Sequence, residues 1–339
     1  MIVSDAWFPQ TNGVVQTLAR TGVWLEHFGH EVRFVTPDRF RSLPCPTYPE
    51  IRLAWMPYRR LCAIADAFAP EAIHIATEGP LGLAARRYCL RRGLAFTTSY
   101  HTQFPQYLRA RIPLPVSVSY RMLRWFHGRA THCMVSTESI RQELEENGFN
   151  NIARWRRGVD TQMFKPGAKS FLMLPRPLAL YVGRLAVEKN IDAFLKMPWE
   201  GGKLVIGDGP ERTRLEKQYP DATFVGYRFR EDLAAHIAAS DVMVFPSLTD
   251  TFGLVNLEAM ACGVPVAAFP VAGPRDVILD GVTGVLGSDL SQAARQALLL
   301  KPDDCREYAL RCGWDVCSRE FESNLVRSVR HPPTNVNRR

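Results

Sequence analysis

Short runs of apolar and β-branched residues alternate with longer helical stretches along most of this chain. The stretches between the runs repeat apolar residues at helical spacing, as at Val14, Leu18, Leu25 and Phe28. The runs cover residues 1–4, 31–37, 51–55, 72–77, 95–101 and 132–137, and then 179–184, 203–210, 222–227, 242–247 and 264–270. Strand–helix alternation of this kind predicts parallel sheets with helices on both faces.

The runs form two series, separated near "KPGAKSFLMLPRP" (165–177). A chain of 339 residues also suits two cores better than one. We therefore predict an α/β protein with two Rossmann-like, doubly wound domains facing a central cleft, where a ligand site is expected. The expected segments are an N-terminal domain, a C-terminal domain, a helix returning to the first domain and a disordered tail, at 1–165, 166–310, 311–330 and 331–339.

Composition removes several other classes of protein. No stretch approaches the roughly 20 apolar residues of a membrane span. The start, "MIVSDAWFPQ", lacks the features of a signal peptide and reads as a strand, which leaves open a native start upstream of Met1. The eight cysteines form no C-x-x-C and no Cys/His group, so we expect reduced thiols in a cytoplasmic protein and no metal site.

Positive charge is concentrated in the first half of the chain. Residues 1–160 contain 20 Arg, no Lys and 13 acids, and residues 79–137 contain nine Arg and no acid. Such a field attracts nucleic acid, lipid headgroups or phosphorylated substrates, although it could equally be a solvated surface. Within it, 107–129 mixes Arg with Tyr, Trp, Phe and Leu. This segment suits either an anionic membrane surface or a helix packed with its arginines in water.

Polar residues follow several of the predicted strands, at the edge where open α/β sheets bind ligands. In "PQTNGVV" (9–15), Gly13 starts the first helix, where it could admit a phosphate or simply form a turn. In "SYHTQF" (99–104), His101 comes just past a strand and has either a structural or a functional role.

The second half carries a sharper pattern. In "YVGRLAVEKN" (181–190), Arg184 and Lys189 are two cations on a loop leading into a helix, which suits a diphosphate. Gly207 lies in the turn "IGDGP" (206–210) after the next strand. Gly253 lies at a helix start, so neighbouring N–H groups would face a ligand, and Glu258 lies about one and a half turns further on.

Two acids, Asp250 and Glu258, stand in "TDTFGLVNLEAMACG" (249–263). On residue type alone they suit metal ligation, paired acid/base chemistry, helix capping or ligand binding. No D-x-D triplet occurs in the chain, so a common metal–diphosphate motif is absent from the sequence.

These motifs, taken in order, resemble the family 4 glycosyltransferases, retaining enzymes of the GT-B fold. The resemblance covers nearly the whole chain and rests on "NGV", "YHT", "RGVD" (157–160), "GRLAVEKN", "GDGP" and the two acids before "GVPV". It is strongest to the branch of mannosyl-, glucosyl- and glucuronosyl-lipid synthases and more distant to sulfoquinovosyltransferase. One departure is Asp250, which stands where the family usually has Glu.

The resemblance implies a role for each position. The first domain would be the acceptor side, and the second would bind the nucleotide sugar. Glu258 would hold the ribose hydroxyls and Asp250 the transferred sugar. Arg184, Lys189 and N–H groups of Phe252, Gly253 and Leu254 would neutralise the diphosphate near the turn of Gly207. Gly13 would close over the phosphates and His101 would orient the sugar.

The implied activity is retaining transfer of a hexosyl group from a nucleoside-diphosphate sugar of the GDP-mannose or UDP-glucose/glucuronate type. Fixed positive groups would replace a metal at the leaving diphosphate, so neither a metal nor another cofactor is expected. The expected acceptor is a membrane lipid such as diacylglycerol or a phosphatidyl glycolipid, and the expected location is cytoplasmic, peripheral on the inner face of the cytoplasmic membrane. The alternatives are a soluble or polysaccharide acceptor, an epimerase or hydrolase on the same scaffold, and a nucleic-acid-binding protein, which lacks a recognisable module.

Overall fold

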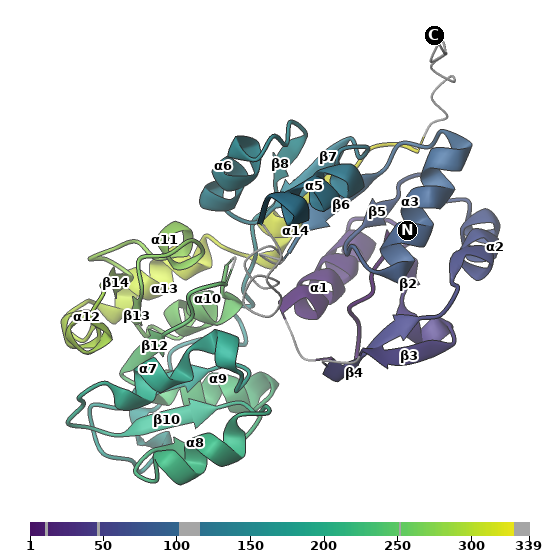
Figure 1. Cartoon of the computed structure of the whole chain (residues 1–339). Coiled ribbons are helices and arrows are strands. Elements are labelled where there is room, and N and C mark those ends of the chain that lie inside the picture. The colour runs from purple at the N-terminus through teal and green to yellow at the C-terminus, as the bar shows by residue number, and fades with distance from the viewer. Residues whose placement is uncertain (11–12, 46–47, 102–115, 251, 329–339) are drawn as a thin grey trace. The chain divides into compact units, whose positions relative to one another are not determined.

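The computed structural model describes residues 1–10, 13–45, 48–101, 116–250 and 252–328. The chain divides into two compact units (Figure 1). Unit 1 consists of Met1–Arg156 together with the chain from Cys317 onward, and unit 2 consists of Arg157–Val316. The expected tail at 331–339 lies outside the described residues.

Unit 1 is built on a six-stranded parallel sheet in the order β2-β1-β5-β6-β7-β8. Its strands are β1 (Ile2–Val3), β2 (Phe34–Val35), β5 (His74–Ile75), β6 (Thr97–Tyr100), β7 (His132–Val135) and β8 (Ile152–Arg154). Its helices are α1 (Gly13–His27), α2 (Tyr58–Phe68), α3 (Pro80–Arg92), α5 (Val116–His127), α6 (Glu138–Glu146) and most of α14 (Trp314–Asn324).

One strand prediction in unit 1 is wrong in its pairing. Residues 51–55 were expected in the parallel series, but most of them lie in β4 (Tyr48–Ala54), which pairs antiparallel with β3 (Ser42–Cys45) outside the main sheet. Only two residues separate these strands, whereas a parallel pair needs a crossover of about a dozen. A connection this short can only bring the chain back antiparallel.

The buried carboxylate of Asp5 joins the end of β1 to the start of α3. It accepts hydrogen bonds from the Leu81 and Gly82 backbone N–H groups, at 2.8 and 3.2 Å, and from the Thr77 hydroxyl at 2.8 Å. Burial raises the pKa of Asp5, although all three donors favour its charged form. Asp5 therefore caps the first turn of α3 from another part of the chain, a position where a carboxylate is favourable.

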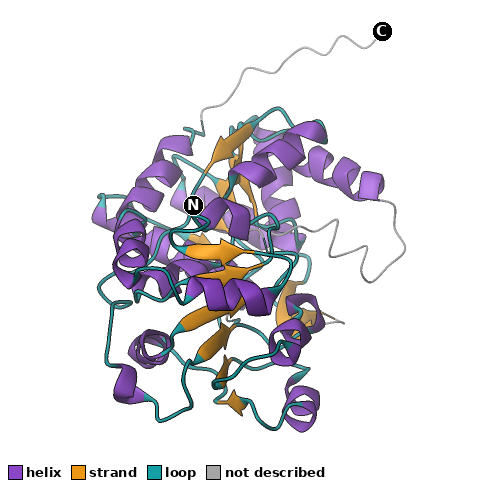
Figure 2. Ribbon diagram, turned by 90° about the vertical axis from the view of Figure 1, so that its left-hand side faces the viewer, coloured by secondary structure: helices purple, strands orange, loops and turns teal. Residues whose placement is uncertain are grey.

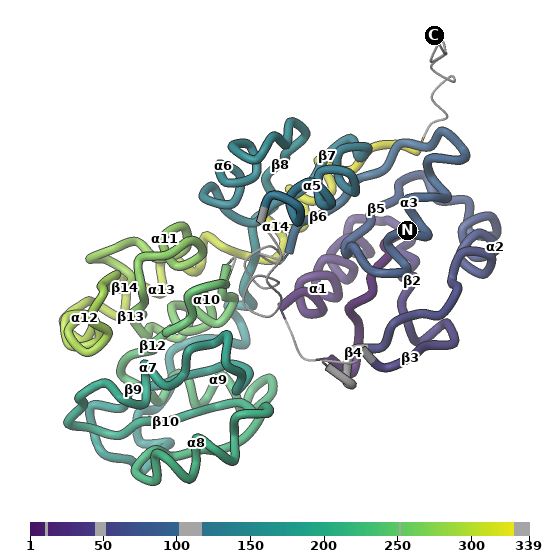
Figure 3. The backbone as a smooth tube through the Cα atoms, in the orientation of Figure 1, coloured from purple at the N-terminus to yellow at the C-terminus, as the bar shows by residue number. Residues whose placement is uncertain are grey.

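The C-terminal segment completes the core of unit 1. The Phe321 side chain of α14 is fully buried, with its ring 4.8 Å from that of His74 and 4.6 Å from that of Trp155. Beyond α14, the Ser328 hydroxyl donates to the Ala95 carbonyl at 3.0 Å. Figure 3 shows this yellow segment continuing from α14 among the blue and teal elements of unit 1.

Unit 2 repeats the same architecture with a second parallel sheet, in the order β11-β10-β9-β12-β13-β14. Its strands are β9 (Ala179–Val182), β10 (Lys203–Ile206), β11 (Thr223–Phe224), β12 (Val242–Phe245), β13 (Val266–Ala268) and β14 (Gly284–Leu286). Its helices are α7 (Ile191–Lys196), α8 (Arg212–Gln218), α9 (Arg230–Ala239), α10 (Leu254–Ala261), α11 (Pro274–Val277), α12 (Leu290–Ala297) and α13 (Pro302–Leu310).

Both faces of the unit 2 sheet are buried. Along β9, Leu180 and Val182 belong to one hydrophobic cluster, and Ala179 and Tyr181 belong to another. Successive strand residues point to opposite faces, so each cluster fills one side of the sheet. Figure 2 shows the orange strands lying among purple helices. The α/β prediction of doubly wound domains is confirmed.

Candidate active site

The predicted site of unit 2 lies at the point where its strand order reverses. Strand β9 is central, with β10 and β11 on one side and β12, β13 and β14 on the other. The loops that follow β9 and β12 therefore leave the sheet in opposite directions, and crevices at such a point bind ligands in open α/β sheets. Arg184 and Lys189 follow β9, whereas Asp250 follows β12.

Lys189 and Asp250 form an ion pair across this point. The Lys189 Nζ lies 2.6 Å from Asp250 Oδ1 and 2.9 Å from Oδ2. Burial alone would raise the pKa of Asp250, but the charge and hydrogen bond of Lys189, together with Ser247 and Arg184, outweigh burial and the pKa is lowered. Asp250 is therefore ionised at neutral pH and acts as a hydrogen-bond acceptor.

Arg184 is held by a carboxylate that the sequence prediction missed. Its Nη2 donates to Glu188 in the short 3₁₀ turn Val187–Lys189, and its backbone carbonyl accepts from the Tyr181 hydroxyl at 3.0 Å. The spacing of four residues between Arg184 and Glu188 was visible in the sequence, but in a non-helical loop it gave no reason to expect contact. Two cations and two acids thus lie together on the loops after β9 and β12.

Asn190 connects these two loops directly. It has a positive φ of 53°, which asparagine adopts more readily than most residues, and its side-chain amide donates to the Pro246 carbonyl at 3.1 Å. The bond fixes the end of the Lys189 turn against the segment leading to Asp250. The Lys189–Asp250 pair is therefore held in position by this hydrogen bond to the backbone as well as by its own charges.

The turn containing Gly207 has a packing role in the structure. A Cβ on Gly207 would lie 1.9 Å from the Gly183 carbonyl oxygen, and the φ of Gly207 is +142°. Its backbone N–H donates to the Gly226 carbonyl at 2.9 Å. Glycine is needed here because two loops of the sheet edge approach each other closely.

Helix α10 presents Glu258 on its accessible face. Leu254, Val255 and Glu258 are half-buried, whereas Asn256, Leu257 and the residues after Glu258 are buried. Gly253 precedes the helix at a φ of +79° and provides no side-chain cap, although its carbonyl accepts from the Asn256 N–H at 3.0 Å. Phe252 packs against the core of unit 2, and Thr251 lies outside the described residues.

The unit 1 candidates are Gly13 and His101. Gly13 begins α1, directly after residues 11–12, which are not described. The His101 ring follows β6, with Nε2 2.8 Å from the Ser99 hydroxyl and the Trp155 ring packed edge-on at 5.6 Å. The Nε2 of His74 lies 3.1 Å from the same Ser99 hydroxyl.

His74 and Ser99 were not predicted as site residues. His74 is buried in β5, and its Nδ1 lies 2.9 Å from the Thr97 hydroxyl. Thr97, His74, Ser99 and His101 therefore form a continuous series of polar contacts within unit 1. The only sequence signal was a histidine inside the apolar run 72–77, which could equally have been a surface residue of a strand.

The described part of the chain offers few other groups with catalytic or metal-binding chemistry. No group of three or more His, Cys, Asp or Glu side chains there could hold a metal ion. The seven cysteines whose side chains are described are all free thiols. None of the helices that the structure describes combines the length and apolar character needed to cross a bilayer.

Comparison with known proteins connects this site to a family. The family model "Glycosyltransferase Family 4" matches residues 11–163, and "Glycosyl transferases group 1" matches residues 176–301. A GDP-mannose-dependent alpha-mannosyltransferase of Mycobacterium tuberculosis is 30% identical over 84% of this chain and 82% of its own. The chain belongs to the family 4 glycosyltransferases. The predicted family and its enzyme class, glycosyl transfer, are confirmed.

The chain is also similar to a second curated protein and to a solved structure of like fold. An alpha-monoglucosyldiacylglycerol synthase of Streptococcus pneumoniae is 26% identical over 89% of this chain and 78% of its own. The solved structure of sucrose-phosphate synthase from Thermosynechococcus elongatus has a TM-score of 0.77 at 22% identity, over 95% of this chain and 96% of that one. The predicted GT-B architecture of this glycosyltransferase is confirmed.

Proposed function

We propose that this glycosyltransferase moves a hexosyl group from a nucleoside-diphosphate sugar to a lipid acceptor, with retention and without a metal. The observation that carries the proposal is the charged group formed by Arg184, Lys189 and Asp250 at the strand-order reversal of unit 2. It combines fixed cations for a diphosphate with an ionised acceptor for sugar hydroxyls.

The cations can serve the diphosphate while remaining paired. An ammonium group has three N–H donors, and Asp250 takes two of those of Lys189, which leaves one for a phosphate oxygen. Arg184 adds a guanidinium, whose fork matches phosphate geometry. With the backbone N–H groups at the start of α10, these donors would stabilise the leaving group by fixed charge.

The acids would select the donor. Glu258 lies on the accessible face of α10, where a carboxylate can accept from two ribose hydroxyls. Asp250, kept ionised by Lys189, would accept from the hexose. Gly13 and His101 of unit 1 are assigned to the phosphates and the sugar, respectively. Gly207 is assigned to the shape of the neighbouring turn.

In the proposed reaction, the bond between the anomeric carbon and the diphosphate oxygen breaks while the acceptor oxygen bonds to the same carbon on the same face. The acceptor proton passes to the departing phosphate oxygen. The protein residues bind, orient and neutralise charge. No side chain needs to form a covalent intermediate.

The names of relatives guide the choice of substrates. One relative is named for GDP-mannose and another for glucosyl transfer to diacylglycerol, so GDP-mannose and UDP-glucose are the first donors to test, with diacylglycerol as acceptor. A lipid acceptor would require access to a bilayer surface, which favours a peripheral location at the cytoplasmic membrane.

The test is to incubate the protein with each donor and measure released nucleotide with and without diacylglycerol, after a thermal-shift panel of GDP, UDP and their sugars. We expect release that depends on the acceptor and persists in excess chelator. Release without any acceptor would indicate a hydrolase, and conversion of the sugar without release would indicate an epimerase. Loss of activity in chelator with rescue by Mg²⁺ or Mn²⁺ would contradict metal independence.

A further inference from the structure

The arginine-rich part of unit 1 folds into a two-helix surface on α3 and α5. On α3 the exposed residues are Leu83, Arg87, Leu90, Arg91 and Arg92. Arg92 pairs with Asp66 of α2, and the other four, which recur at helical spacing, belong to this surface. On α5 and the turn after it, the exposed residues include Arg121, Met122, Arg124, Trp125, Gly128 and Arg129. We call this set the α3/α5 face. It alternates cationic and apolar side chains on both helices.

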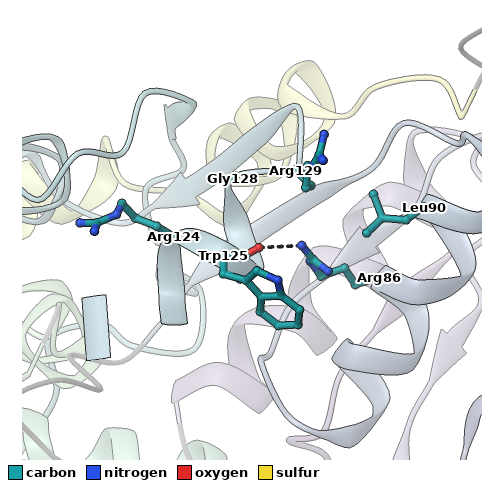
Figure 4. Close-up of a pocket in the computed structure, with 6 residues that line it drawn as sticks. All are labelled: Arg86, Leu90, Arg124, Trp125, Gly128 and Arg129. Carbon is teal, nitrogen blue, oxygen red and sulfur yellow. Dashed lines mark hydrogen bonds between the residues drawn. The ribbon is translucent and has the colours of Figure 1, made fainter. Parts of the chain in front are cut away.

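Two adjoining hollows run along this face, with volumes of about 400 and 420 Å³. Both are lined by Arg86, Leu90 and Trp125. Arg124 and Arg129 line the first hollow (Figure 4), and Arg87 and Arg91 line the second. The face therefore has a groove with arginines on both sides of a central tryptophan.

Arg86 fixes the shape of the groove. Its side chain is buried, and it donates from Nε to the Phe126 carbonyl at 3.0 Å and from Nη2 to the Trp125 carbonyl at 2.6 Å. Its guanidinium lies 4.1 Å from the centre of the Trp125 ring (Figure 4). A residue of α3 thus holds the end of α5 and keeps Trp125, which is 58% exposed, at the surface.

Among the described residues, no acid pairs with the exposed arginines of the groove. Other arginines bond to carboxylates, as Arg92 at the end of α3 does with Asp66 and Arg214 does with Asp192 and Glu211. By contrast, no described carboxylate forms an ion pair with any exposed arginine of the face, namely Arg87, Arg91, Arg121, Arg124 and Arg129. An uncompensated cluster of this kind attracts an anionic partner.

The apolar residues decide which anionic partner fits. Leu83 and Leu90 on α3 are 43% and 42% exposed, and Met122 on α5 is 58% exposed. A nucleic-acid backbone offers little to such side chains. The boundary between lipid headgroups and acyl chains accepts arginine, tryptophan and leucine together. Arginine binds phosphate, tryptophan prefers the headgroup level and leucine enters the apolar layer.

We propose that the α3/α5 face docks on an anionic lipid bilayer and holds headgroup phosphates in the groove beside Trp125. The inference deepens the proposed lipid acceptor, since it gives the enzyme a surface for reaching that lipid. Arg121 and Arg124 of this face belong to the segment 107–129, whose mixture of Arg and apolar residues suits a membrane surface. Arg109 and Arg111 lie outside the described residues.

The test measures sedimentation of the full chain with phosphatidylcholine vesicles and with vesicles containing about one third phosphatidylglycerol. One variant combines Arg91→Gln and Arg129→Gln, one arginine from each side of the groove. Each basic residue near an anionic surface is worth about 1 kcal/mol, so the double variant should bind anionic vesicles roughly thirty-fold more weakly. The wild type should prefer anionic vesicles, and added salt should weaken its binding.

The matched control combines Lys217→Gln and Arg295→Gln, which remove two exposed charges from unit 2. Neither residue pairs with a carboxylate in the described structure. The control should bind as the wild type does. Equal losses in both double variants, or equal binding to neutral and anionic vesicles, would overturn the proposal. So would retention by a duplex oligonucleotide that the vesicles cannot displace, because it would assign the face to nucleic acid.

A second measurement separates docking from catalysis. Glycosyl transfer to a short-chain diacylglycerol dispersed without vesicles needs no bilayer, so the Arg91→Gln/Arg129→Gln variant should keep the wild-type rate there. It should lose rate when the acceptor is presented in anionic vesicles. If no transfer occurs under any condition, the proposed function fails while the vesicle result still decides docking. If the variant loses rate equally in both formats, the face serves folding or catalysis and docking is rejected.

Discussion

Asp250 and Glu258 are carboxylates eight positions apart that the structure places in different surroundings. Asp250 is bound by an ammonium group at 2.6 Å, and its side chain is 23% exposed. Glu258 stands on a helix face whose neighbours are half-buried. With Glu258 at the ribose and Asp250 at the hexose, loss of Glu258 should weaken nucleotide binding. Loss of Asp250 should instead impair transfer of the sugar.

Glu258→Ala should weaken the bare nucleotide and the nucleotide sugar alike, because both carry the ribose. A hydrogen bond to a charged group is worth about 1.5–3 kcal/mol, so affinity should fall roughly ten- to a hundred-fold in calorimetry. Glu188→Ala is a useful comparison, since that carboxylate pairs with Arg184 nearby. Unchanged nucleotide affinity in Glu258→Ala would remove this residue from the ribose site.

Asp250→Asn should leave nucleotide affinity nearly unchanged and lower turnover, because the hexose at the reacting centre loses a charged acceptor. Asparagine keeps the size of aspartate and an oxygen that can accept from Lys189, so a purely structural role would survive the change. Calorimetry with the bare nucleotide measures its affinity, and a turnover assay with the sugar donor measures the rate of transfer. Full activity in Asp250→Asn would reduce the residue to a local structural role.

Ser99→Ala should lower the rate without weakening donor binding. The hydroxyl lies between His74 and His101, at 3.1 and 2.8 Å, so its loss leaves the His101 ring without that support. One hydrogen bond of 0.5–1.5 kcal/mol corresponds to roughly a two- to tenfold loss in kcat. Ser119→Ala in α5, also a buried serine, is the control and should keep the wild-type rate. Parallel losses of kcat and thermal stability in Ser99→Ala would indicate a structural role only.

At the scale of elements, α3 depends on a carboxylate that comes from β1. Asp5 is 6% exposed and accepts three hydrogen bonds, so it has little freedom to move. The helix it caps also carries one side of the α3/α5 face. A change at this junction should therefore affect stability and, through the helix, the shape of that face.

Gly79→Ala should destabilise unit 1. A Cβ on Gly79 would lie 2.5 Å from the Asp5 Cγ, and such overpacking typically costs about 1–3 kcal/mol. Gly287→Ala is the control, because its Cβ would have no neighbour nearer than 3.4 Å. Denaturant unfolding should show a lower midpoint only for Gly79→Ala. Equal midpoints would mean that Asp5 moves aside at little cost.

The sequence predicted elements well where one element carried a long apolar pattern. The run 203–210 gave β10 because Leu204, Val205 and Ile206 are all buried on a two-sided sheet. It missed β8 and β14, because both are edge strands and have only one fully buried residue between them, so neither stands out as an apolar run. The Arg184–Glu188 and His74–Ser99 contacts were also missed, because they depend on loop conformation and strand register.

At the scale of the whole molecule, the chain has two cores of different construction. Unit 2 is one continuous segment, whereas unit 1 is assembled from both ends of the chain. Sequence periodicity predicted the two series of strands, but it could not locate the division at Arg156 and Arg157. Apolar patterns show that a residue is buried without showing in which core.

Phe321→Ala should lower the melting temperature of unit 1 selectively. Removing a fully buried phenylalanine costs about 3–5 kcal/mol, or roughly 10 °C for a domain of this size. The matched change in unit 2 is Phe194→Ala, which is equally buried. Calorimetry of both variants should show each change shifting a different transition. A single transition that shifts equally in both would mean that the units unfold together.

The return of the C-terminal segment has a consequence for synthesis on the ribosome. Unit 2 ends at Val316, so all its strands have been made before the chain supplies Phe321. Until then, His74 and Trp155 lack the ring that covers them. The N-terminal part of unit 1 is therefore synthesised long before its core can be completed by Phe321. Unit 2, although synthesised later, is the first unit that can finish folding.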